Sequence, residues 1–309
     1  MLKFYRYLIS LTILASLFCA HKGPPLRIDR IDPKIRKITP INEHQITLDF
    51  SEELDTLNIN ANDFAIYTEE ETLKIFAANP GITVDQILLT TDKMKHIEYE
   101  IHGKAFDKSG RMGIFKSKFL GSTKPDTIAP WLTHYSKGGR LKYFSLKFSE
   151  PVDTLSFKYN VFPKKAMQGK WQFMKNLSIV PANEYDSLSY DTTYYLYVKE
   201  IRDLSGNLAQ PIVTCITPDT IYNPLFIKGK VLVNDTPVVK GIALIETDKI
   251  LGICLISHGQ FLFEVRDSNN YFVRAFSSNC YGADSVSASN IDNIINLNPG
   301  VYELDSIIN

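Results

Sequence analysis

The sequence is poor in the residues and motifs that usually carry chemistry. Among 309 residues there are only four cysteines and two tryptophans, and no Cys-x-x-Cys pair or Cys/His cluster has the spacing of a zinc site. No Gly-x-Ser-x-Gly elbow, Walker loop, His-Glu-x-x-His motif or dinucleotide fingerprint occurs, and the six histidines are scattered. The sequence therefore predicts a non-enzymatic protein, with no catalytic and no cofactor-binding residue.

The chain also lacks an excess of either charge. It has 34 Lys and Arg against 34 Asp and Glu, so nothing predicts long-range attraction to nucleic acid, and we expect no nucleic-acid partner. A hydrophobic fraction of 44% excludes a disordered chain. One segment, residues 162–176, is basic and contains Trp171. It could contact polysaccharide or nucleic acid, but an exposed loop is the favoured interpretation.

An uncharged, mostly apolar run lies at the N-terminus. Residues 8–20 follow the basic residues Lys3 and Arg6, and they are few for a membrane span, which needs about 20. This pattern predicts a signal peptide over residues 1–20 and export of the protein. An uncleaved anchor stays open as the alternative.

Cys19 stands where this run ends, and "SLFCA" resembles a bacterial lipoprotein cleavage site. Ser16 and Phe18 depart from that pattern, which prefers an aliphatic and a small residue there. The resemblance implies lipidation of Cys19, with residues 21–29 as a tether. The expected partner is then the membrane, through this lipid anchor, at the outer membrane or cell surface. Cleavage after Ala20 stays open.

Cys215, Cys254 and Cys280 are odd in number, so they cannot all pair within the chain. Cys254 and Cys280 fall in the same C-terminal unit and could form a disulfide in an oxidising compartment. Three small buried thiols are the slightly favoured alternative.

An octapeptide occurs twice, as "FSEELDTL" (residues 50–57) and "FSEPVDTL" (residues 148–155). Apolar residues alternate before each copy, which predicts a strand with one buried face. Pro151 cannot donate a ladder hydrogen bond, so it should end the second strand. We expect Asp55 and Asp153 to accept backbone N–H bonds in the turns that follow.

A second pair of matches supports a duplication. Asp107–Gly110 and Asp203–Gly206 both read Asp-x-Ser-Gly, at nearly the same spacing as the octapeptides. Each follows an alternating run, and Asp, Ser and Gly favour a tight turn between strands. The chain therefore contains a repeated unit of roughly ninety residues, a size typical of a β-sandwich.

These motifs resemble the bacterial Ig-like domains of surface-layer and other envelope proteins. The carriers are "ITLDFSEELD" with "AFDKSGRMG", and "FSLKFSEPVD" with "YYLYVKEIRDLSGNLA". The first copy departs at Glu53, where the family has Pro, and at Arg111, where it has Asn. The resemblance implies two Ig-like sandwiches, over residues 30–121 and 131–218, joined by a stiff proline-containing linker at 122–130.

The third unit is expected over residues 219–309. Turn signals at Asn234–Pro237, His258-Gly259 and Ser268–Asn270 separate apolar runs, and a final strand is expected at 301–307. The order of these elements resembles the carboxypeptidase regulatory-like module, a small prealbumin-like sandwich. The resemblance implies an accessory β domain with no catalytic residues. The fold class is thus all-β: two tandem Ig-like β-sandwiches followed by a small prealbumin-like β-sandwich.

The repeated acidic residues are interpreted as structural. Glu52, Asp55, Glu150 and Asp153 recur once per unit, as a role in the fold predicts, so no metal residue is assigned. Calcium is the stronger rival to catalysis, although no Asp-x-Asp-x-Asp loop occurs. Trp131 and Trp171 could form a sugar platform, but burial in the core is favoured.

The resulting hypothesis is a non-enzymatic, lipid-anchored cell-envelope protein that acts as a spacer, scaffold or adhesion component in contact with other envelope proteins. The alternative is an accessory glycan- or calcium-binding module.

Overall fold

The computed structural model describes residues 31–136, 141–218, 223–290 and 292–308. The predicted signal peptide (1–20), the tether (21–29) and Cys19 lie outside the described residues. Apart from η1, η2 and the five-residue helix α2, all regular secondary structure in the described residues is β-strand, so the all-β prediction is confirmed. No helix in the described ranges is long and apolar enough to cross a membrane.

The first sandwich consists of two four-stranded sheets, ordered β1-β2-β6-β5 and β4-β3-β7-β8. Ile46, Leu48 and Phe50 of β2 are completely buried, which confirms the expected period of two. The elements are β1 (Ile35–Pro40), β2 (Gln45–Phe50), η1 (Ala61–Asp63), β3 (Phe64–Tyr67), β4 (Thr72–Leu73), β5 (Ile75–Pro80), β6 (Gln86–Thr91), β7 (Glu98–Phe106) and β8 (Met112–Leu120).

The second sandwich pairs the sheet β12-β13-β10-β9 with the sheet β11-β14-β15. Strand β10 ends at Phe148, and β11 begins at Val152 in the other sheet, so Pro151 stands at a corner between sheets. The elements are β9 (Leu132–Tyr135), β10 (Phe144–Phe148), β11 (Val152–Phe162), β12 (Met167–Gln172), β13 (Asn176–Pro181), η2 (Glu184–Asp186), β14 (Tyr194–Asp203) and β15 (Ile212–Ile216).

The third unit is one continuous sheet, ordered β17-β16-β20-β19-β18-β21-β22-β24, with β23 parallel to β16. Strands β19 and β20 share only the pair Ser257↔Gln260, so the sheet separates there into two layers. The elements are β16 (Leu225–Val233), β17 (Thr236–Pro237), β18 (Lys240–Glu246), β19 (Ile250–Ser257), β20 (Gln260–Val265), β21 (Asn270–Ser277), β22 (Cys280–Ser287), β23 (Asn293–Asn296), β24 (Asn298–Pro299) and α2 (Leu304–Ile308).

The predicted turns are present. Asn234 and Asp235 both have positive φ between β16 and β17, and His258 and Gly259 do so between β19 and β20. Left-handed backbone at two successive residues suits the tight turn of a hairpin.

The predicted final strand at 301–307 is wrong, because the chain forms helix α2 over Leu304–Ile308. Leu304, Ile307 and Ile308 all contact the core of the third unit. Their spacing is helical, at i, i+3 and i+4, whereas a strand would turn alternate side chains to opposite faces.

The disulfide considered for Cys254 and Cys280 is excluded. Cys254 lies in β19 and Cys280 in β22, and strands β18 and β21 lie between them. The pairs Cys254↔Ala243, Ala243↔Ala275 and Ala275↔Gly282 connect the four strands in turn. Three strand spacings place the two thiols roughly 14 Å apart, whereas the Cα atoms of a disulfide are within about 7 Å. Cys215, Cys254 and Cys280 are all thiols.

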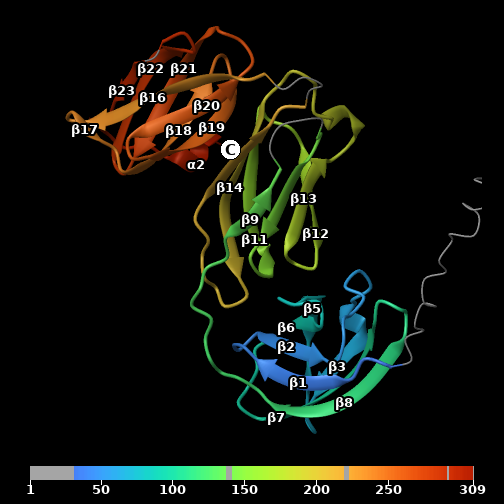
Figure 1. Cartoon of the computed structure of the whole chain (residues 1–309). Coiled ribbons are helices and arrows are strands. Elements are labelled where there is room, and N and C mark those ends of the chain that lie inside the picture. The colour runs from blue at the N-terminus through green and yellow to red at the C-terminus, as the bar shows by residue number, and fades with distance from the viewer. Residues whose placement is uncertain (1–30, 137–140, 219–222, 291, 309) are drawn as a thin grey trace, which may run out of the picture.

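The three units follow one another in a row, and the first and third lie apart (Figure 1). The first and second sandwiches have separate hydrophobic cores. The third core also includes Phe162, Tyr195 and Tyr197 of the second sandwich. The first junction is therefore polar and the second is apolar.

Candidate carboxylate site at the first junction

The aspartate of each octapeptide copy accepts a backbone N–H two residues further along. Asp55 Oδ1 accepts the N–H of Leu57 at 3.1 Å, and Asp153 Oδ1 accepts that of Leu155 at 3.0 Å. The expected turn is confirmed for Asp55. For Asp153 it is wrong, because Asp153 and Leu155 lie within β11, where the pairing register shifts after Asp153. Glu150 has a different environment, because it joins two carboxylates that lie outside the octapeptide.

Three carboxylates converge where the first and second sandwiches meet. Asp126 comes from the segment between β8 and β9, Glu150 from the corner after β10, and Asp203 from the end of β14. One oxygen of each lies within 4.8 Å of the other two. Asp203 is buried, while Asp126 and Glu150 are half-buried. We call these three residues the junction cluster.

The Asp-x-Ser-Gly turn fixes Asp203. The N–H of Asn207 donates to Asp203 Oδ1 at 2.8 Å, and the Asn207 amide donates to Oδ2 at 2.7 Å. The same amide nitrogen donates to the backbone oxygen of Asp126 at 3.0 Å, which ties this hairpin to the linker. Gly206, at φ +90°, permits the turn.

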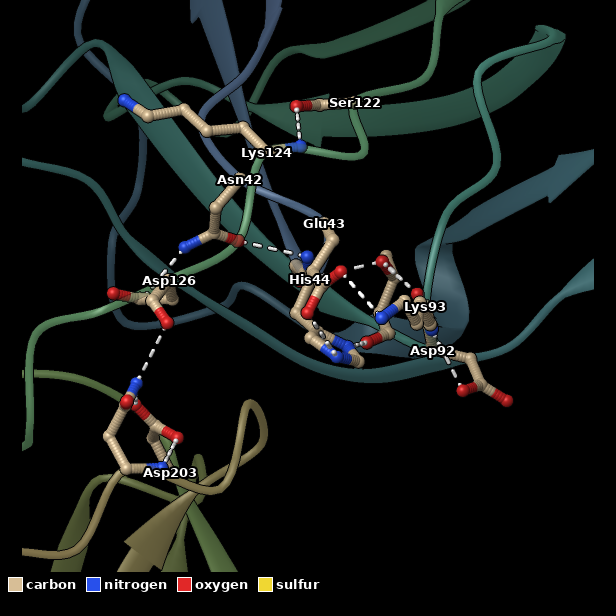
Figure 2. Close-up of polar contacts among 11 residues, drawn as sticks. Asn42, Glu43, His44, Asp92, Lys93, Ser122, Lys124, Asp126 and Asp203 are labelled. Atoms are coloured by element: carbon tan, nitrogen blue, oxygen red, sulfur yellow. Dashed lines mark hydrogen bonds and ion pairs between the residues drawn. The ribbon is translucent and has the colours of Figure 1, made fainter.

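The first sandwich contributes through the loop between β1 and β2 (Figure 2). Asn42 Nδ2 donates to Asp126 Oδ2 at 2.8 Å, and the N–H of Glu43 donates to the backbone oxygen of Lys124 at 2.9 Å. From β2, Gln45 Nε2 donates to Glu150 Oε2 at 3.3 Å. The junction cluster is thus part of the contact between the two sandwiches.

The electrostatics of the cluster are unfavourable when all three groups are ionised. Burial raises the pKa of Glu150 from 4.5 to about 7, with added contributions from the charges of Asp126 and Asp203. Lys175 opposes this shift only weakly, and burial lowers its own pKa. Within the part of the chain that the structure describes, no Lys, Arg or His forms an ion pair with the three carboxylates.

The donor set fits a hard divalent cation. Calcium prefers carboxylate and carbonyl oxygens at about 2.3–2.6 Å, so ligands on opposite sides of the ion are about 4.6–5.2 Å apart. The oxygens of the junction cluster all lie within 4.8 Å of one another, so one ion could contact all three. Asp126, Glu150 and Asp203 are therefore the residues that could hold a metal.

The equivalent turn of the first sandwich has different charged neighbours. Asp107 matches Asp203, and its Oδ1 accepts the N–H groups of Ser109 and Arg111, both at 2.8 Å. Arg111 stands where the second copy has Asn207, and its guanidinium pairs with Asp32 at 2.9 Å. An arginine supplies positive charge there, whereas the second copy gathers carboxylates.

The octapeptide repeat singles out Glu150, but no sequence motif assigns Asp126 or Asp203 to a site. The signal was present, since Asp203 opens a repeated Asp-x-Ser-Gly motif and Asp126 lies in the linker that precedes a repeated unit. Only the folded chain brings a linker, a sheet corner and a hairpin to one point.

Other predicted sites are placed as follows. Trp131 is 56% exposed, so its expected burial in the core is wrong, because it precedes β9 at a sheet edge. Trp171 is half-buried against Phe148 and Phe157. The basic segment 162–176 contains edge strand β12, and residues 163–166 and 173–175 on either side of it are not in strands, so the expected loop is correct only in part. Glycan binding stays a prediction.

Comparison with known proteins gives a limited result. No protein family and no curated protein matches the sequence. Among solved structures, the N-terminal part of the bacterial S-layer protein SbsC is 12% identical over 60% of this chain and 44% of its own, with a TM-score of 0.29. Dimeric latent PorU from Porphyromonas gingivalis is 8% identical over 86% and 34%, with a TM-score of 0.32.

The pilin BcpA of Bacillus cereus is 8% identical over 77% of this chain and 94% of its own, with a TM-score of 0.21. The chain spans less than half of the S-layer fragment. Every TM-score is below 0.5, so these likenesses carry no inference about activity or partner.

Proposed function

We propose that the protein is a non-enzymatic spacer or scaffold of the cell envelope, lipid-anchored through Cys19 at the outer membrane or cell surface. The observation that carries this proposal is the arrangement of three β units in a row, each touching only its neighbour (Figure 1). Such a row presents a long lateral surface to other envelope proteins. The N-terminal pattern of residues 1–20 supports export and anchoring.

Fractionation of cells that express the full chain tests this proposal. The wild type should remain with membranes, and Cys19→Ala should move to the soluble exported fraction. Cys280→Ala is the matched control and should stay membrane-bound. Mass spectrometry of the mature protein should show a diacylated or triacylated N-terminal cysteine. An unmodified N-terminus beyond Cys19 would remove the anchor, and a protein found in the cytoplasm would remove the envelope role.

Calcium binding at the junction cluster is the second candidate function. It is favoured by three carboxylate oxygens within 4.8 Å and by the absence, among the described residues, of an ion pair that would neutralise them. A divalent cation there would link the linker, the second sandwich and, through Asn42 and Gln45, the first sandwich. Its effect would be to fix the angle between the two sandwiches.

Calorimetric titration of the exported chain with calcium tests the second candidate. We expect one saturable site, with a dissociation constant of about 10⁻⁴ M, which is common in extracellular modules. Asp126→Asn and Glu150→Gln should each weaken binding at least about tenfold, because each removes a charged ligand. Asp153→Asn should bind as the wild type does, since this carboxylate accepts the N–H of Leu155 and is not part of the junction cluster. No heat from the wild-type protein would exclude the site.

A further inference from the structure

Strand β14 forms part of two hydrophobic cores. Five successive residues, Tyr194–Val198, are all buried, which a strand with one solvent-facing side would not allow. Tyr194, Leu196 and Val198 belong to the core of the second sandwich. Tyr195 and Tyr197, on the opposite face, belong to the core of the third unit.

Tyr195 closes a gap in the sheet of the third unit. Strand β19 pairs with β20 only at Ser257↔Gln260, and Tyr195 meets β20 further along this strand, at Glu264. The Tyr195 hydroxyl donates to the Glu264 backbone oxygen at 2.7 Å and accepts from the Glu264 N–H at 2.6 Å. Burial raises the pKa of this hydroxyl well above 10.0, which keeps it neutral.

The Tyr195 ring is fitted to its neighbours. It meets Phe263 edge-on, with ring centroids 6.1 Å apart. A Cβ atom at Gly252 would lie 2.6 Å from the ring, so only glycine leaves room for it. Cavities of about 140 and 310 Å³ lie along the seam, and both are lined by Tyr195 and Glu264. Tyr195 thus lines both clefts and packs between the two units.

The Glu264 side chain is also bound across the seam. Its carboxylate accepts the hydroxyl of Thr217 at 2.7 Å and the thiol of Cys215 at 3.6 Å, both from the second sandwich. At the end of the chain, Asn160 donates to the backbone oxygen of Ile308 at 3.3 Å. Breaking buried hydrogen bonds of this kind destabilises the folded protein, because each buried polar group without a partner costs about 1–3 kcal/mol of stability.

We propose that the second sandwich and the third unit unfold as one cooperative body pinned by Tyr195, and that the first sandwich unfolds by itself. Among the described residues, the apolar cores of the first and second sandwiches have no member in common, so no comparable contact couples those two units. The proposal concerns the folded chain and does not depend on where the protein resides.

Hydrogen exchange on the protein without its predicted signal peptide, residues 1–20, tests this coupling. Tyr195→Phe keeps the ring and removes the hydroxyl that bonds both the backbone N–H and the backbone oxygen of Glu264. We expect amides of both β13 and β21 to exchange about 10- to 100-fold faster, with β2 and β6 unchanged. Tyr99→Phe is the matched control, since the Tyr99 hydroxyl accepts the N–H of Lys95 at 3.0 Å within the first sandwich. This variant should accelerate hydrogen exchange at the amides of β2 and β6, and leave exchange in β13 and β21 unchanged.

Tyr194→Phe decides between coupling and local damage. Its hydroxyl accepts the N–H of Ser189 at 3.1 Å inside the second sandwich, and its ring belongs to that sandwich's core. In a cooperative body, Tyr194→Phe also accelerates exchange in β21 of the third unit. If its effect stops at the second sandwich, or if calorimetry resolves three separate transitions, the proposal is overturned.

Chemical rescue gives an independent test. Tyr195→Ala should merge the two cavities into a space that accepts p-cresol, as enlarged apolar cavities accept small aromatics. Millimolar p-cresol should then raise the midpoint of the shared transition in this variant, but not in Tyr99→Ala. If Tyr195→Ala does not fold, Tyr195→Phe and Tyr194→Phe still decide the question. A folded Tyr195→Ala with an unchanged transition contradicts the role of Tyr195.

Discussion

At the scale of single residues, Glu150 makes the stability of the second sandwich depend on pH. Its pKa is raised from 4.5 to about 7 in the folded chain, so the folded state holds the proton more tightly than the unfolded state. The free energy of unfolding should therefore fall as the pH rises from about 4.5 to about 7, and stay level above that.

Glu150→Gln should remove this decline, because the amide mimics the protonated acid. At pH 8 in the presence of a chelator, the variant should be more stable by about 1 kcal/mol, a value reduced for the partial exposure of the group. Urea unfolding at pH 5 and pH 8 measures the difference. Parallel changes with pH in the wild type and the variant would show that Glu150 is not the group responsible.

Cys254 should be the least reactive thiol of the third unit. Burial raises its pKa to about 12, so almost no thiolate forms near neutral pH. With iodoacetamide at pH 8, we expect Cys280 to be alkylated in the native protein and Cys254 only in denaturant. Peptide mass spectrometry reads both sites in one sample. Equal native labelling of the two would contradict the buried position of Cys254.

At the scale of elements, the two Asp-x-Ser-Gly hairpins depend on backbone that only glycine adopts easily. Gly110 and Gly206 have φ of +80° and +90°, and a Cβ atom at either position would meet no other atom within 4 Å. Alanine at either position should therefore cost about 1–2 kcal/mol through backbone strain alone. Gly206→Asn should cost less than Gly206→Ala, since asparagine visits this conformation more readily.

Differential scanning calorimetry of the full exported chain can separate these effects. Gly110→Ala should lower only the transition of the first sandwich, and Gly206→Ala only that of the second sandwich with its partner unit. An unchanged midpoint for both alanine variants would mean that the turns relax without strain.

The elements that sequence predicted best are those whose signal is local. Alternation in residues 46–50 and 144–148, and the turns at Asp107 and Asp203, depend on a few neighbouring side chains. Helix α2 was missed because its three apolar residues have meaning only against the core they cover. The junction cluster was missed for the same reason, since its members come from a linker, a corner and a hairpin.

The double burial of β14 could have been noticed in "YYLYV", residues 194–198. An unbroken apolar run in a strand indicates cover on both faces, but it does not say which unit supplies the second cover. The second cover is the third unit, where Gly252 leaves room for the Tyr195 ring and β19 separates from β20. Neither feature can be predicted from the residues next to β14 in the sequence.

At the scale of the whole molecule, the two junctions should respond differently to cutting. A protease recognition sequence inserted after Ile128, which is 61% exposed, would allow the chain to be cut between the first two sandwiches. Because the contacts there are hydrogen bonds between partly exposed groups, the two products should separate on gel filtration in the presence of a chelator. Co-elution of the products would mean that the junction is stronger than its polar contacts indicate.

The shared strand β14 also decides which pieces of this protein can be produced in isolation. In a recombinant fragment that stops at residue 218, the side chains of Phe162, Tyr195 and Tyr197 would form an exposed hydrophobic patch. This fragment should aggregate into inclusion bodies when it is expressed. A fragment of residues 131–309, which keeps the second sandwich and the third unit together, should be soluble.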